Sequence, residues 1–154
     1  MRRTILATAV LGTALATAPA AHADVAQPFR ADYSGTAAPT SYGAHFSNGS
    51  GVATGLGRIT TSGDGVITGP GACANGFANT NTQSLTAANG DTLTIRSLDV
   101  ACPDGTPGGY DGTGSWTVVS GTGRLARVQG SGQLTGHLDL ARGTFELHLR
   151  GVLQ

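Results

Sequence analysis

The last third of the chain, Gly112 to Leu153, alternates apolar and polar residues between glycine-bearing turns. In its final segment the odd positions from 145 to 153 are apolar or glycine. The even positions from 144 to 150 are threonine, glutamate, histidine and arginine. A repeat of two residues is the period of a β-strand that buries one face. The pattern therefore predicts an all-β protein.

The same pattern fixes how the last two strands pair. Placing Leu138 opposite Phe145 and Leu134 opposite Leu149 keeps the large apolar side chains on one face, whereas a slip of one residue would expose them. This register leaves a loop of four residues, 140–143, a length that is commonly built around a type I turn. The two segments are therefore expected to form a β-hairpin.

The predicted hairpin register also sets His137 opposite Glu146 on the outer face. One interpretation of this pair is an acid/base couple. The other is a solvated cross-strand pair, which adds only a few tenths of a kcal/mol to stability. Because both residues lie on the predicted solvent face, we favour the second interpretation.

The first 23 residues have the features of an export signal. Arg2 and Arg3 precede an apolar stretch, 5–18, and Ala21-His22-Ala23 matches an A-x-A cleavage site. The arginines directly follow Met1, which favours Sec-type export over the twin-arginine route. The apolar stretch is too short for a membrane span. We therefore expect a secreted mature chain, residues 24–154, that forms one domain and contacts no membrane.

The charge of the mature chain excludes one class of partner. Seven arginines, no lysine and nine acidic residues give a net charge of −2 with neutral histidines. Phosphate backbones are bound by clustered basic side chains, and these arginines are scattered from Arg30 to Arg150. The composition therefore predicts no nucleic-acid partner.

Two cysteines, Cys73 and Cys102, remain after the signal segment. An even pair in an exported chain is most simply a disulfide. In the chain-entropy model, closing a loop of about 30 residues stabilises the fold by roughly 3 kcal/mol. Two cysteines without suitably spaced histidines make a poor metal site, so we expect neither a metal nor any other cofactor.

The middle of the chain predicts further short strands, separated by turns and loops. Apolar patterning places them at 27–35, 51–60, 72–78, 82–88 and 91–100. Asp64-Gly65 and Asn89-Gly90 are hairpin turn signals, whereas 36–50 and 101–112 are rich in loop-forming residues. Between 91 and 100 the apolar parity changes, which predicts a β-bulge near Arg96 and Ser97. Eight to ten strands of this kind suit a closed barrel or a sandwich.

Four glycine-bearing motifs carry a resemblance to a known family. In order along the chain they are Ala53-Thr54-Gly55-Leu56-Gly57-Arg58, Leu85-Thr86-Ala87-Ala88-Asn89-Gly90-Asp91, Ser120-Gly121-Thr122-Gly123-Arg124-Leu125 and Ser131-Gly132-Gln133-Leu134-Thr135-Gly136. The chain resembles bacterial secreted proteins with an allene oxide cyclase barrel-like, or dirigent-like, domain. The resemblance implies a small antiparallel closed barrel of about eight strands, calycin- or dirigent-like. It implies no common activity, but it suggests an apolar small molecule held in the barrel mouth.

Three function classes remain open at this point. The first is a secreted barrel that binds an apolar small molecule, set against a barrel simply filled by its own side chains. The second is a cofactor-free cyclase or isomerase acting in the mouth, with candidates Arg58, Asp99, Tyr110, Asp111 and Arg124. The third is a structural or interaction module that self-associates as a homo-oligomer, in which Trp116 is either an exposed anchor or part of the core.

Overall fold

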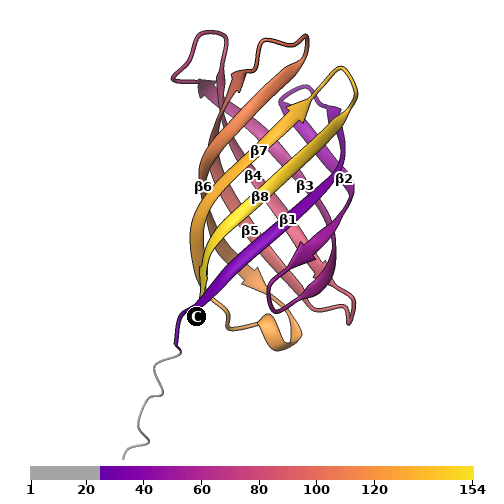
Figure 1. Ribbon diagram of the computed structural model, residues 1–154, viewed down its shortest axis with the longest axis vertical. Helices are drawn as coiled ribbons and strands as arrows, with labels where there is room; N and C mark the ends of the chain where they lie inside the picture. The colour runs from indigo at the N-terminus through magenta and orange to yellow at the C-terminus, as the bar shows by residue number, and fades with distance from the viewer. Residues whose placement is uncertain (1–24) are drawn as a thin grey trace, which may run out of the picture.

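The computed structural model describes residues 25–154, which form an all-β closed barrel of eight antiparallel strands (Figure 1). Each strand pairs with the next, and β8 closes the barrel against β1. The elements are β1 (Gln27–Pro39), β2 (Gly43–Ala53), β3 (Gly57–Pro70), β4 (Phe77–Ala87), β5 (Thr92–Pro103), β6 (Gly109–Gly121), the 3₁₀ turn η1 (Gly123–Leu125), β7 (Gly130–Asp139) and β8 (Thr144–Leu153). The predicted fold class is confirmed. The proposed signal segment, 1–23, lies outside the described residues.

The predicted pairing of the last hairpin is also confirmed. Leu138 lies opposite Phe145 and Leu134 opposite Leu149. His137 lies opposite Glu146, as the register requires, but its ring turns to the other neighbouring strand. There Nδ1 of His137 lies 3.0 Å from Oδ1 of Asp111 on the outer face of β6. His137 therefore pairs with Asp111 of β6, a residue outside the β7–β8 hairpin.

The barrel interior is filled with side chains at one end, the end that carries η1 and the last residues of β8; we call it the solid end. Six large side chains are less than 2% exposed there or just above it: Trp116, Phe29, Leu85, Leu93, Ile95 and Leu149. Trp116 meets Phe29 edge to face at 5.4 Å between ring centroids, and its Nε1 donates to the Gln133 carbonyl at 3.0 Å. Trp116 is therefore a core residue, and the alternative of an exposed anchor is wrong.

Two turn assignments from the sequence are wrong. The segment 36–50, expected as loop, belongs mostly to β1 and β2, which are joined by a short turn at 40–42. Asp64-Gly65 lies inside β3, and the chain turns instead at 54–56. Glycine, serine and alanine suit these strands because an eight-stranded barrel has little room inside. The small residues of these segments therefore fit the barrel interior and do not mark turns of the chain.

The predicted bulge near Arg96 and Ser97 is misplaced. The pairing of β5 with β6 shifts between Thr94 and Ile95, and the inward parity of β5 continues unchanged after it. Ser97 is consequently 3% exposed, whereas Leu98 points outward and is 59% exposed. The strand turns polar residues inward and an apolar residue outward, the reverse of the usual pattern.

The predicted disulfide is present and joins Cys73, in the loop between β3 and β4, to Cys102 near the end of β5. The described residues contain no free cysteine. Such bonds are typical of oxidising compartments. A separate finding concerns helices: within residues 25–154 none is long and apolar enough to cross a bilayer.

Candidate functional site

A cavity of about 310 Å³ occupies the half of the barrel away from η1. Four connections surround this end: β1–β2, β3–β4, β5–β6 and β7–β8 (Figure 1). The volume is at the lower end of the range for small-molecule sites, about 300–1,000 Å³. The sequence left a filled interior and a hollow interior open. The structure has both, one in each half of the barrel.

Most of the cavity wall is apolar. Aromatic rings come from four strands, as Phe46, Phe77, Tyr110 and Phe145, and leucines come from β7 and β8. Phe46 meets Phe145 edge to face at 5.1 Å between ring centroids, and Phe77 lies 5.0 Å from Tyr110. These rings hold one another in place, so the wall is formed before any ligand arrives.

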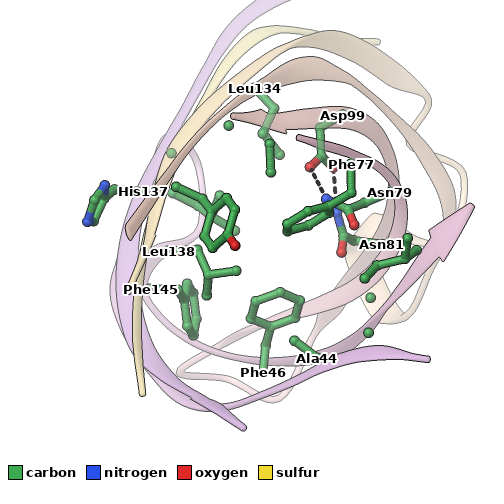
Figure 2. A pocket seen from close by; sticks show the side chains of 18 of the residues that line it. Ala44, Phe46, Phe77, Asn79, Asn81, Asp99, Leu134, His137, Leu138 and Phe145 are labelled. Carbon is green, nitrogen blue, oxygen red and sulfur yellow. Dashed lines mark hydrogen bonds between the residues drawn. The ribbon is translucent and has the colours of Figure 1, made fainter. Parts of the chain in front are cut away.

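One side of the cavity is polar and is centred on Asp99 of β5. In Figure 2 Asn79, Asn81 and Asp99 gather on one side, while Phe46, Phe145 and Leu138 lie across from them. Nδ2 of Asn79 donates to Oδ2 of Asp99 at 3.1 Å, and Nδ2 of Asn81 donates to Oδ1. The hydroxyl of Ser97 also donates to Oδ1, at 3.2 Å. Both carboxylate oxygens are therefore fixed by neutral donors.

The glycine at position 65 makes room for this polar cluster. Gly65 of β3 lies directly opposite Asn81 of β4 in the sheet. A Cβ atom at position 65 would collide with Oδ1 of Asn81. The glycine thus lets the amide turn its nitrogen toward Asp99 while its oxygen occupies the space beside β3.

The low-polarity surroundings change the titration of the interior groups. Burial raises the pKa of Asp99 above its ordinary value of 3.8, and the hydrogen bonds from Asn79, Ser97 and Asn81 oppose that rise. Burial also raises the pKa of Tyr33, with a further contribution from the negative charge of Asp99. The Tyr33 hydroxyl donates to Oε1 of Gln83, deeper in the barrel. Asp99 is thus the acidic group of the cavity.

The raised pKa of Asp99 makes a testable contribution to stability. A carboxyl group whose pKa is higher in the folded state stabilises the fold fully below its unfolded pKa, and this contribution is lost as the pH rises through the folded value. Relative to Asp99→Asn, the wild type should therefore lose stability as the pH rises from 3.8 toward neutrality. Urea unfolding of both proteins over this range would check it. A constant difference between them would contradict the shift.

The structure separates the five residues that the sequence offered as catalytic candidates. Asp99 and Tyr110 line the cavity. Asp111 is exposed on the outer face of β6, opposite His137. Arg58 is exposed at the start of β3, and Arg124 in η1 pairs with Asp91 at 3.0 Å, both at the solid end. Within residues 25–154 none of the five hydrogen-bonds to another.

Sequence reasoning missed the amide side chains of the polar cluster. Asn79, Asn81 and Gln83 occupy alternate positions of β4 and all line the cavity. Thr80 and Thr82 lie between them and Ser84 follows, so both faces of this strand are polar. The sequence does contain a signal for them. Phe77 and Leu85 lie on either side of the three amides along β4, at the same alternate positions, and apolar residues at those positions mark the inward face. That alternation places the amides inside.

A second group of ligand-type side chains lies outside the barrel at the open end. Asp104, Asp111 and His137 each offer one donor atom, and these atoms lie within 4.8 Å of one another. Asp104 is already engaged, because the backbone N–H and the hydroxyl of Thr106 both donate to its Oδ1 at 2.7 Å. The two aspartates are exposed, and nothing beyond their proximity indicates a metal.

The fold and the cavity define the chain as a small disulfide-bonded antiparallel barrel, filled at one end and hollow at the other. Comparison with protein-family profiles, curated proteins and solved structures found no match. The resemblance to the dirigent-like family therefore stays a prediction, while the barrel that it implies is present.

Proposed function

We propose that the chain is a non-catalytic binding protein that takes an apolar small molecule into the open half of its barrel. The observation that carries this proposal is the 310 Å³ cavity, walled by aromatic rings and leucines and located where the connecting turns leave the barrel open. None of the six large side chains that are less than 2% exposed lines the cavity. The dirigent-like resemblance and the predicted export agree with an extracellular binding role, and a mature protein that begins at Asp24 would support export.

The proposal is tested by titration with phenylnaphthylamine, a dye whose fluorescence rises in apolar surroundings, followed by displacement with lipids and phenolic compounds. Leu138 lines the cavity, so Leu138→Trp should fill it and weaken dye binding by about tenfold or more. Leu98→Trp is the matched control, because Leu98 is 59% exposed on the outer face. It should bind the dye as the wild type does.

Two results would count against the binding function. In one, the wild type binds neither the dye nor any compound of the panel. In the other, Leu138→Trp and Leu98→Trp have the same dye affinity, which would place the dye outside the cavity. Unfolding curves for both variants would establish that each retains the barrel before the affinities are compared.

A cofactor-free cyclase or isomerase is the second candidate, and the raised pKa of Asp99 favours it, because a general acid or base needs a pKa nearer neutrality. Two facts favour binding alone. Both oxygens of Asp99 already accept hydrogen bonds from the protein. Asp99 and Tyr110, the two catalytic candidates that line the cavity, are not hydrogen-bonded to each other in the described chain.

A further inference from the structure

Asp99 is an interior carboxylate with no cationic partner in the described chain. The sequence contains no lysine, and all seven arginines after the signal segment are exposed. The groups that contact the carboxylate are two amides and a hydroxyl, all neutral. A buried charge is costly unless a charge of opposite sign compensates it. The protein therefore leaves one negative charge at the cavity wall for something else to neutralise.

The hydrogen-bonding capacity around Asp99 is also one-sided. An ionised carboxylate can only accept, so Asn79 and Asn81 turn their nitrogens toward it. Their Oδ1 atoms face away from Asp99, and no hydrogen bond within residues 25–154 is donated to either. The polar groups left unpaired beside Asp99 are thus acceptors. A ligand that satisfies them has to bring donors.

The aromatic rings of the cavity suit a positive charge as well. Phe46, Phe77, Tyr110 and Phe145 line the same cavity, and the face of an aromatic ring attracts a cation within about 6 Å. Rings and a carboxylate in one cavity give an organic cation both an apolar contact and a counter-ion. An anionic ligand would instead meet the charge of Asp99 in surroundings of low polarity, where like charges repel strongly.

We infer that the ligand of this cavity is an organic amine, an apolar body that carries a protonated nitrogen, and that Asp99 is its counter-ion. This inference rests on the proposed binding function and names the ligand class for the same site. The ammonium group donates to the carboxylate of Asp99, whose oxygens have lone pairs beyond those that accept from Asn79, Asn81 and Ser97. Its hydrocarbon part fills the space between the aromatic rings and the leucines of β7 and β8.

The test compares three compounds that share one hydrocarbon body, a phenyl ring on four methylenes: 4-phenylbutylamine, 4-phenylbutanol and 5-phenylpentanoate. Isothermal titration calorimetry on the mature protein near neutral pH should show that the amine binds most tightly, the alcohol less tightly and the carboxylate least tightly. Because a single ion pair in surroundings of intermediate polarity is involved, we expect the amine to bind about tenfold or more tighter than the carboxylate.

Asp99→Asn should remove this preference. Its affinity for the amine should fall about tenfold, while its affinity for the alcohol should stay within about threefold of the wild type. Asp64→Asn is the matched control, because it deletes an exposed carboxylate on the outer face of β3, next to Gly65 of the cavity wall. It should leave the order and the affinities unchanged.

A measurement on the wild type covers the case in which Asp99→Asn does not fold. The ratio of amine to alcohol affinity should fall as the pH is lowered and Asp99 takes up a proton. The groups that face Asp99 are Asn79 and Asn81 from β4, Gly114 from β6 and the buried Tyr33 from β1, none of which gains a charge at acid pH. His137 is the histidine among the cavity-lining residues, so the series is repeated in His137→Gln, where the ratio should fall in the same way.

The outcomes separate the inference from the proposed function. If the three compounds bind equally, if the carboxylate binds most tightly, or if the ratio is independent of pH, the amine assignment is overturned and the binding function stands. If none of them binds and phenylnaphthylamine does not bind either, the binding function fails and the amine assignment fails with it.

Discussion

Trp116→Ala should lower the free energy of unfolding by about 3–5 kcal/mol, the range for truncating a fully buried large aromatic residue. Trp116 is 1% exposed, packs edge to face against Phe29 and donates its indole N–H to the Gln133 carbonyl. Its removal would leave a cavity in the filled half of the barrel and take away the hydrogen bond. Urea unfolding monitored by far-ultraviolet circular dichroism measures the loss without depending on tryptophan fluorescence.

The matched control for Trp116→Ala is Leu98→Ala on the neighbouring strand. Leu98 is a large apolar residue, but it is 59% exposed on the outer face of β5, so its truncation should cost well under about 1 kcal/mol. The sequence pattern predicted the opposite, with Leu98 on the buried side of a bulge. A loss at Leu98 as large as the loss at Trp116 would therefore show that the inward parity of β5 is wrong.

Removing the disulfide with Cys73→Ser and Cys102→Ser together should lower the free energy of unfolding by about 2–4 kcal/mol. The two cysteines are 29 residues apart, and the bond restricts the unfolded chain over that length. It also ties the loop between β3 and β4 to the end of β5, close to the open end. Urea unfolding of the double variant and of the oxidised wild type gives the difference.

A reducing agent provides the control for the disulfide. The wild type with its bond reduced should unfold at the urea concentration of the double variant, and the double variant should not respond to the reducing agent. A change of less than about 1 kcal/mol in the double variant would mean that the unfolded chain is already restricted without the bond.

The period-two alternation of the final segment determined a large part of this structure. It fixed the pairing of Leu134 with Leu149 and of Leu138 with Phe145, because a slip of one residue exposes large apolar side chains to water. The turn at Asn89-Gly90 was equally readable, since Gly90 takes a positive φ of 87° that suits a tight hairpin. The disulfide followed from two cysteines in a chain with a predicted export signal.

Only the tertiary structure decided what lies inside the hollow half. Ser97 and Asp99 on β5, and Asn79 and Asn81 on β4, point inward although a strand read alone would place them in water. Their direction follows from the register of the whole strand, which is set by apolar residues several positions away. The register of the β4–β5 hairpin then places Asn79 opposite Asp99 and Asn81 opposite Ser97, which gives the carboxylate its neutral donors. The sequence by itself determined the all-β class and the pairing of the closing hairpin, where apolar burial dominates. The polar side of the cavity depends on contacts between strands, and these cannot be predicted from the alternation within one strand.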